Sequence, residues 1–400
     1  MLEQRSQNKV STAGLMSSAC AGMFVFGMAM AILGAILPSL FAKIEFDKSE
    51  AGNLFFYMNL SMLIMSIVFG PVVDRFGYRF FLIICALLVA GSLFMLTVSA
   101  SYIMVLTAAV ILGFGGGGLN GGTNALTSDI HPERRGSALN VLGIFFGFGA
   151  LTIPFLIGTL LEIWGLNLIL LSATLLSLVP FILFLAFTFP QPKHDQGFPL
   201  GQASKIIGNP LLWLCGFVLF FQSGNEFTVG GWISTYLHEH FQVTPMLASL
   251  VLAGYWAAIM SGRLLSSRIV SKVGNEFMVL ASAFLSLIAA FLIVTSPSKT
   301  LASLGAVLIG LGFAAVFPTT LAVVGGAFPS FSGTAFSAVL VIALAGGMTC
   351  PWLAGKVAQA HSIKQGLFIP VFNCSMIIVL QVVIIKILRG RGSPDRKDRP

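Results

Sequence analysis

Long apolar runs separated by short polar stretches recur along almost the whole chain. Each run has about the 20 residues that a helix needs to cross the hydrocarbon of a bilayer. The runs lie near 12–41, 51–72, 80–99, 102–127, 137–160, 167–189, 211–237, 246–266, 277–296, 301–325, 334–355 and 366–386. Their connections are short except for 190–209, a polar stretch that contains three prolines and two lysines. The pattern predicts twelve membrane-spanning helices in two sets of six.

The composition favours a membrane protein over a soluble one. Only 9% of the 400 residues are charged and 56% are hydrophobic, and the mean hydropathy is +0.95. A soluble domain carries about 25% charged residues. We therefore predict an all-α membrane protein of twelve transmembrane helices in two pseudo-symmetric six-helix bundles. The expected parts are an N-terminal bundle (1–190), a cytoplasmic linker (191–209) and a C-terminal bundle with a basic cytoplasmic tail (210–400).

The basic residues predict the orientation in the membrane, because cytoplasmic loops carry an excess of Lys and Arg. With twelve spans, seventeen of the 22 Lys and Arg residues fall on the side of the two termini and five on the other. Both termini are therefore expected in the cytoplasm, in a plasma membrane such as a bacterial inner membrane. The net charge of +8 follows from this topology. The basic tail is expected to meet the membrane face, and no nucleic acid is expected as a partner.

An internal repeat supports the division into two halves. Nine of the 21 Gly and Pro residues between 34 and 158 recur 197 residues later, where composition predicts roughly two by chance. The matched pairs are Gly34 and Gly231, Gly77 and Gly274, Gly113 and Gly310, Gly115 and Gly312, Pro132 and Pro329, Gly136 and Gly333, Gly149 and Gly346, Pro154 and Pro351, and Gly158 and Gly355. Two parallel halves of shared backbone geometry around a central site suit alternating access.

The stretch GPVVDRFGYR at 70–79, between the second and third runs, resembles the signature loop of the major facilitator superfamily. It departs from that signature at Tyr78, where a basic residue is usual. The loop at 262–274 resembles a second copy that lacks the acid. The resemblance implies a monomer that rocks two bundles about a central site, with a latch at the cytoplasmic mouth. The latch residues expected from it are Gly70, Asp74, Arg75, Gly77, Arg79, Arg134 and Arg263. Alternatively, the charges of this loop only mark the topology.

A narrower resemblance is to the fucose–galactose–glucose symporter branch and its sodium-linked glucose-transporter relatives. The fragments that carry it are GGWISTY (230–236), LN (139–140), FGFGA (146–150), FPT (317–319) and PWLAG (351–355). It implies transport of a sugar. The chain departs from fucose permease, which carries buried acids in its first and fourth helices. Here 24–37 contains no ionisable residue, and Asn120 stands at the matching position of the fourth span.

Glu226 is the one acid that lies deep in a predicted span. Ionisable groups at this depth are costly and usually face a cavity, so Glu226 is a functional candidate. Three options are open: Glu226 takes over proton coupling, Na⁺ binds amide and hydroxyl oxygens together with Glu226, or transport is uncoupled. We favour cation coupling through Glu226; a structural hydrogen bond within the bundle is the alternative. No cofactor is expected besides a co-transported H⁺ or Na⁺.

Sugars are held by amide and carboxylate groups, with an aromatic ring against the apolar face of the pyranose. The residues expected to bind substrate are Asn120, Asn124, Asn140, Gln222, Asn225, Glu226, Trp232, Trp256 and Thr319. The asparagines could instead join helices, and the aromatic residues could anchor span ends. No residue grouping suggests an enzyme. No metal site is expected either, because His238, Glu239 and His240 lie in an outer loop.

These observations predict a secondary active transporter that imports a small neutral hydroxylated solute, a monosaccharide, together with H⁺ or Na⁺. The expected partners are this small molecule and the lipid bilayer. One alternative is an exporter of drugs or amphipathic solutes, for which the 36 Phe residues leave room. An alternative of another class is a non-transporting nutrient sensor or a lipid scramblase. The repeat and the Asp74 loop weigh against a static sensor.

Overall fold

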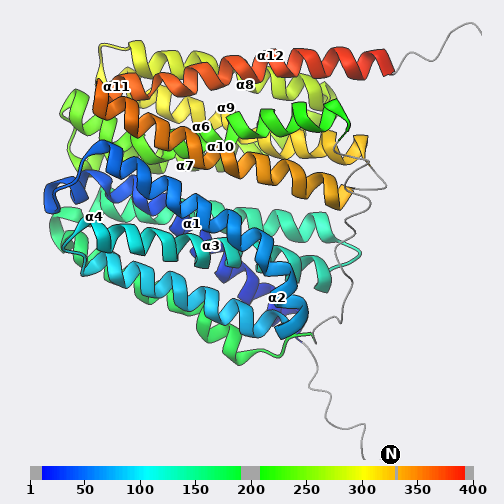
Figure 1. Cartoon of the computed structure of the whole chain (residues 1–400), viewed down its shortest axis with the longest axis horizontal. Coiled ribbons are helices and arrows are strands. Elements are labelled where there is room, and N and C mark those ends of the chain that lie inside the picture. Colours follow the sequence, from blue (N-terminus) through cyan, green and yellow to red (C-terminus); the bar gives the residue numbers. More distant parts are fainter. Residues whose placement is uncertain (1–10, 191–207, 329–331, 392–400) are drawn as a thin grey trace, which may run out of the picture. The chain divides into compact units, whose positions relative to one another are not determined.

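The computed structural model describes residues 11–190, 208–328 and 332–391, and all regular structure in these ranges is helical (Figure 1). The helices are α1 (Thr12–Lys43), α2 (Lys48–Thr97), α3 (Tyr102–Ile130), α4 (Arg135–Ala186), α6 (Pro210–Phe241), α7 (Pro245–Val273), α8 (Asn275–Thr295), α9 (Lys299–Ala327), α10 (Ser332–Ala360), α11 (Ile363–Gly366) and α12 (Phe368–Arg391). The expected linker up to residue 207 and the last nine residues of the basic tail lie outside the described residues.

The long helices account for the predicted spans. Within the described ranges, nine helices are long and apolar enough to cross a membrane. Two of them, α2 with 50 residues and α4 with 52, have room for two spans each. They change direction at Gly77 (φ 80°) and Gly165 (φ 67°), where a positive φ favours glycine. With α6, whose interior is more polar, the long helices provide the twelve spans. The prediction of an all-α membrane protein is confirmed.

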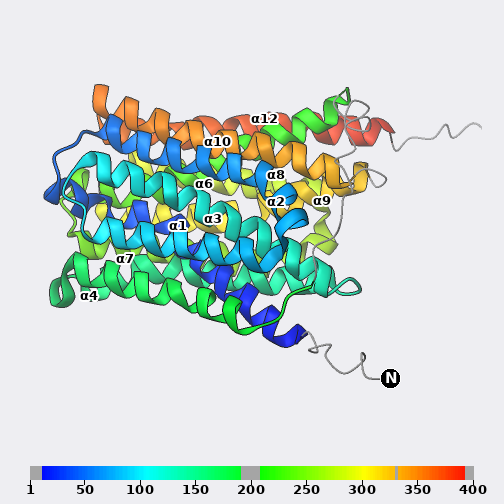
Figure 2. The same cartoon turned by 60° about the horizontal axis from the view of Figure 1, so that its bottom comes forward.

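The described helices form two compact units. Unit 1 comprises Met1–Gly197 with Thr244–Ala253, and unit 2 comprises Phe198–Val243 with Gly254–Pro400. Within unit 1, α1 packs against α4 and α2 against α3; within unit 2, α6 packs against α10 and α12, and α8 against α9 (Figure 1, Figure 2). The first turns of α7 thus belong to unit 1, where the Ser249 hydroxyl donates a hydrogen bond to the carbonyl oxygen of Ala35 at 3.4 Å.

The 197-residue repeat recurs as a pair of close helix contacts, one in each unit. A Cβ on Gly113 of α3 would lie 2.1 Å from the carbonyl oxygen of Met58 in α2. A Cβ on Gly310 of α9 would lie 2.5 Å from the carbonyl oxygen of Tyr255 in α7. Met58 and Tyr255 are themselves 197 residues apart. Small residues let helix backbones approach this closely in a membrane, so the repeat preserves helix packing.

A matched turn accompanies these contacts. Gly77 has φ 80° and ψ 162°, and Gly274 has φ 87° and ψ 153°. Gly77 connects the two spans of α2, whereas Gly274 is the N-cap of α8 directly after α7. Both halves therefore use glycine to reverse the chain at the same point of the repeat.

Large apolar side chains are exposed on both units. Ile163 is 76% exposed, Ile67 63% and Ile288 65%. In water such surfaces would mark binding or aggregation sites. In a bilayer they face lipid, which agrees with the membrane assignment.

Candidate functional site

The middle of α6 carries several buried polar side chains, among them Gln222, Asn225 and Thr228. The helix starts at Pro210 after the Asn209 N-cap, whose side-chain oxygen accepts from the Leu211 N–H at 3.0 Å. Gln222 and Glu226 lie one turn apart near its centre, about 18 Å and about 24 Å along the axis from its start. The Gln222 side chain is buried and that of Glu226 is partly exposed. A site for a polar solute could therefore form at the centre of this helix.

Gln222 and Glu226 are directly joined. The Gln222 Nε2 donates to Glu226 Oε1 at 2.9 Å and to the carbonyl oxygen of Phe313 in α9 at 3.2 Å. The Gln222 Oε1 is buried without a hydrogen-bond partner among the described residues. An unpaired buried acceptor is costly. This oxygen therefore remains an unsatisfied acceptor among the described residues.

Helix α7 contributes further side chains next to Gln222 and Glu226. The Tyr255 hydroxyl donates to the main-chain carbonyl oxygen of Glu226 at 3.3 Å. The Tyr255 ring lies edge-on to Phe313, 6.4 Å between centroids, and to Trp256 at 5.3 Å. Arg263, about two turns further along α7, interacts electrostatically with the Glu226 carboxylate and with Tyr255. We call Gln222, Glu226, Tyr255, Trp256 and Arg263 the α6–α7 cluster.

Two residues expected at the site face other helices of unit 2. Asn225 is fully buried, and its Nδ2 donates to Cys374 Sγ of α12 at 3.4 Å. Trp232 is also fully buried, and its Nε1 donates to the carbonyl oxygen of Pro351 in α10 at 3.0 Å. Both contacts join helices within the bundle. Thr319 of α9 is 6% exposed, and no hydrogen bond places it in the α6–α7 cluster.

The three asparagines of unit 1 differ in their surroundings. Asn124 Nδ2 donates to Asn120 Oδ1 at 2.9 Å and to the Asn120 carbonyl oxygen at 2.8 Å, both within α3. The two side chains are partly exposed. Asn140 lies in α4 with an exposed side chain. The structure therefore brings Asn120 and Asn124 together, but no contact links Asn140 to them.

The signature loop lies at the turn of α2. Asp74, Arg75 and Arg79 are exposed; the Arg75 guanidinium lies 5.3 Å from the Phe76 ring centroid. Arg79 Nη2 donates to the carbonyl oxygen of Leu185 at 2.7 Å. Of the other expected latch residues, Gly70 has open space beside it, and Arg134 is the exposed N-cap of α4. Arg263 belongs to the α6–α7 cluster instead of this loop.

Tyr78 makes a contact that the sequence did not lead us to expect. Its hydroxyl donates to Asp129 Oδ2 at the end of α3, at 2.8 Å. Burial and the hydrogen bond to Asp129 raise the pKa of Tyr78 above its ordinary value. The signal in the sequence was the departure from the signature at this position. The neutral Tyr78 hydroxyl is the hydrogen-bond donor to Asp129 at a position where the signature loop usually has a basic residue.

The Arg263–Glu226 interaction was also missed, although the sequence contained a sign of it. Arg263 falls inside the predicted span 246–266, although it also belongs to the predicted latch loop at 262–274. The prediction that His238, Glu239 and His240 lie in a loop is wrong, because α6 continues to Phe241. In this last turn His238 Nδ1 lies 2.8 Å from the Val243 carbonyl oxygen, and the His240 ring stacks on Tyr236 at 5.2 Å. Over the described ranges, no group of three or more His, Cys, Asp or Glu residues could hold a metal ion.

The glycine-packed bundles, the lipid-facing surface and the buried polar cluster define a helical membrane transporter. The profile of the Major Facilitator Superfamily matches residues 19–351 and 212–399. The chain belongs to this superfamily, and it is a transporter and not an enzyme.

Individual relatives are distant. The chain is 23% identical over 392 residues to the glucose/mannose transporter GlcP of Bacillus subtilis, covering 93% of this chain and 94% of GlcP. It is 22% identical over 310 residues to the multi-drug resistance efflux pump PmrA of Streptococcus pneumoniae, covering 74% and 77%. Among solved structures, a D-xylose-proton symporter superimposes with a TM-score of 0.75 at 17% identity, covering 94% and 97%. This last likeness concerns the fold alone.

Proposed function

We propose that the protein imports a small neutral hydroxylated solute, a monosaccharide, by alternating access coupled to H⁺ or Na⁺. The observation that carries the proposal is the α6–α7 cluster, where an amide, a carboxylate and two aromatic rings meet in the interior of one bundle. It acts as a monomer in the plasma membrane, a bacterial inner membrane, with both termini in the cytoplasm. The resemblance to the glucose/mannose transporter GlcP supports a sugar as the substrate class.

The chemistry of the cluster suits a sugar. A hydroxyl both donates and accepts, so one sugar hydroxyl can donate to the unpartnered Gln222 Oε1 while another meets the Glu226 carboxylate. The rings of Tyr255 and Trp256, 5.3 Å apart, offer an apolar wall beside these groups. Binding sites for small molecules combine a few placed polar groups with such aromatic surface. Asn120 and Asn124 of unit 1 remain proposed substrate contacts.

Coupling follows from the charge of Glu226. A carboxylate at membrane depth needs a positive partner or a proton. Arg263 meets this need when no solute or cation is present, since it interacts with the carboxylate. A co-transported H⁺ or Na⁺ then competes with Arg263 for the same oxygen atoms. Binding of the cation releases the guanidinium, and this exchange of partners ties cation binding to the position of α7 against α6.

The test is uptake by the purified protein reconstituted in liposomes. A panel of radiolabelled monosaccharides is offered with an imposed Na⁺ gradient, with an imposed pH gradient, and with neither. Wild-type protein is expected to accumulate one sugar class only when one of the gradients is present. Glu226→Gln should bind the sugar but not accumulate it against a gradient. Glu162→Gln, the same change at an exposed carboxylate of α4, serves as the control.

Two outcomes would overturn the proposal. If Glu226→Gln kept the full dependence on the cation gradient, coupling through this residue would be wrong. If no monosaccharide gave saturable uptake while lipophilic cations were extruded, the protein would be an exporter. The likeness to the efflux pump PmrA is the observation that favours this second function.

A further inference from the structure

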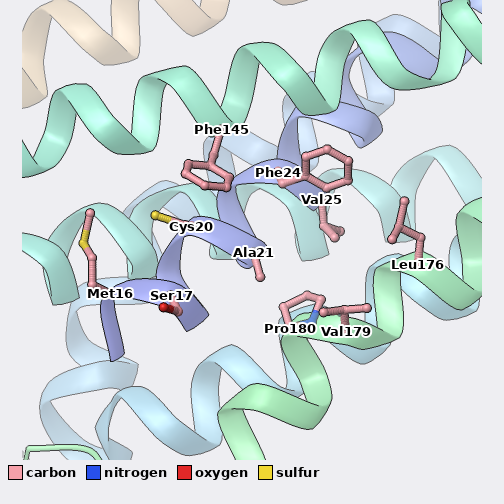
Figure 3. Close-up of a pocket in the computed structure, with 10 residues that line it drawn as sticks. All are labelled: Met16, Ser17, Cys20, Ala21, Phe24, Val25, Phe145, Leu176, Val179 and Pro180. Atoms are coloured by element: carbon pink, nitrogen blue, oxygen red, sulfur yellow. The ribbon is translucent and has the colours of Figure 1, made fainter. Parts of the chain in front are cut away.

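Unit 1 contains a cavity of about 420 Å³ that the transport site does not use. Figure 3 shows that its walls come from the first half of α1 and from both spans of α4. The lining residues are Met16, Ser17, Cys20, Ala21, Phe24, Val25, Phe145, Leu176, Val179 and Pro180. Its volume lies within the range of small-molecule pockets, about 300–1,000 Å³.

The cavity has a simple geometric cause. α1 and α4 cross in close contact, because a Cβ on Gly27 would lie 2.1 Å from the Phe146 carbonyl oxygen and one on Gly149 1.8 Å from that of Phe24. The lining residues of α1, from Met16 to Val25, lie N-terminal to Gly27, and Phe145 of α4 lies N-terminal to Gly149. The second span of α4, with Leu176, Val179 and Pro180, closes the wedge only in part. The close contact at Gly27 and Gly149 therefore leaves a space between the helices on the N-terminal side of these glycines.

The lining cannot hold a sugar. It consists of hydrocarbon, aromatic rings and the sulfur atoms of Met16 and Cys20, with the Ser17 hydroxyl as its polar side-chain group. A monosaccharide would lose its hydrogen bonds to water here without replacement. An apolar chain has no hydrogen bonds to water to lose, and burying its surface here is favourable.

The cavity opens toward the surface that lipid covers. Three of its lining residues are also well exposed: Phe145 at 39%, Leu176 at 37% and Val179 at 42%. The neighbouring Leu175 and Ile182 are 61% and 59% exposed. In a bilayer these side chains face acyl chains, so a lipid tail enters from the hydrocarbon without crossing water.

The depth and charge of the cavity fit one leaflet. Phe145 lies ten residues beyond Arg135, about 15 Å along the helix, which is about half of the 30 Å hydrocarbon thickness. Arg134 and Arg135 are exposed at the start of α4. Guanidinium groups at a membrane surface attract anionic lipid headgroups.

We propose that this cavity between α1 and α4 is a binding site for one acyl chain of an anionic phospholipid, whose headgroup lies against Arg134 and Arg135. The bound chain fills the wedge and covers Cys20. A bilayer lipid thereby becomes part of the packing of unit 1.

The test uses phosphatidylglycerol with a photoreactive diazirine in its acyl chain. The full-length protein is reconstituted in vesicles of phosphatidylcholine containing this probe, irradiated, and mapped by peptide mass spectrometry. Labelling is expected to concentrate in 16–25 and 176–180 and to fall when unlabelled phosphatidylglycerol is added. Ala21→Trp, which fills the cavity, should reduce this labelling roughly tenfold. Ala186→Trp, an exposed position of α4 outside the cavity, should leave it unchanged.

Three results would overturn the proposal. Labelling spread evenly over the lipid-facing peptides of both units would mean ordinary solvation by lipid. Labelling of Ala21→Trp equal to wild type would place the lipid elsewhere. Displacement by tetraphenylphosphonium but not by phosphatidylglycerol would make the cavity a site for amphipathic cations. The wild-type map decides the matter even if Ala21→Trp does not fold.

Discussion

The two units share a glycine framework but not their polar interior. Gly113 and Gly310 make equivalent close contacts, and Gly77 and Gly274 make equivalent turns. The two charged residues of the α6–α7 cluster do not follow the repeat. A shift of 197 residues matches Glu226 with Ala29 and Arg263 with Ser66. Conversely, Asn120 and Asn124 of unit 1 match Phe317 and Leu321.

This contrast separates two kinds of constraint. Helix contacts in a membrane depend on small residues at fixed positions, so both halves keep them. An ionisable residue at membrane depth is expensive, so such residues are rare and need not occur in both halves. Unit 1 therefore offers neutral amides where unit 2 offers a charge pair. Each of the following predictions tests one part of this difference.

The largest effect is expected from breaking the charge pair of unit 2. Removing one partner of a buried ion pair lowers the free energy of unfolding by about 3–5 kcal/mol. Because Glu226 is partly exposed, we expect a smaller loss of about 2 kcal/mol for Arg263→Gln. The double variant Glu226→Gln/Arg263→Gln should regain most of this stability but not cation-driven uptake. Thermal unfolding in detergent and proteoliposome uptake measure the two effects.

Arg268→Gln provides the matched control for the charge pair, since Arg268 is exposed on the same helix. Arg268→Gln should change neither the thermal stability nor the cation-driven uptake. If Arg263→Gln behaved like Arg268→Gln, the two charges would not act as a pair, and the two units would differ less than we infer.

The shared framework should respond equally in both units. Gly113→Ala and Gly310→Ala each force a backbone shift, because the new Cβ would meet a carbonyl oxygen at 2.1 Å or 2.5 Å. Overpacking costs about 1–3 kcal/mol, and the gain in helix propensity offsets up to about 1 kcal/mol, so a net loss of about 1–2 kcal/mol is expected. Gly143→Ala, with open space around it, should be neutral or stabilising. Thermal unfolding temperatures compare the three; unequal losses would argue against a common framework.

The amides of the two units should differ in their effect on substrate affinity. Gln222→Leu removes an unpartnered oxygen and the link to Glu226, and we expect KM to rise roughly tenfold, the loss of about one hydrogen bond. Asn124 already donates twice within α3, so Asn124→Leu should raise KM by less than about threefold. Initial uptake rates over a range of sugar concentrations give both values. A larger effect at Asn124 would move the main binding contacts to unit 1.

The smallest effect concerns the turn of α2, which has no counterpart contact in unit 2, since Tyr78 and Asp129 match Asn275 and Gly326. Tyr78→Phe removes the 2.8 Å hydrogen bond to Asp129 and should cost about 1 kcal/mol near neutral pH. Because the pKa of Tyr78 is raised in the folded state, its contribution is complete below its ordinary pKa. It is lost as the pH rises above about 10. Thermal unfolding of both proteins from pH 7 to 11 should show the difference shrinking; a difference that grows with pH would contradict this assignment.

The sequence predicted three members of the α6–α7 cluster: Gln222 and Glu226 of α6, and Trp256 of α7. Gln222 and Glu226 are four residues apart, and residues at that spacing meet on one face of any helix. Asn225 is also close in sequence, but it lies on a different face and donates to Cys374. Sequence spacing could not reveal this, because the helix that covers each face is set by packing.

The sequence by itself determined the spans and the glycine repeat that marks the two halves, because membrane crossing and repeated glycines depend on residue type and periodicity along the chain. Only the tertiary structure decided which helices supply the rest of the site. Arg263 is 37 residues from Glu226, and it acts on that carboxylate because α7 lies beside α6, where the Tyr255 hydroxyl reaches the Glu226 carbonyl oxygen. The wedge between α1 and α4 likewise follows from a crossing at Gly27 and Gly149. Distances between helices follow from packing in three dimensions, and no local pattern contains them.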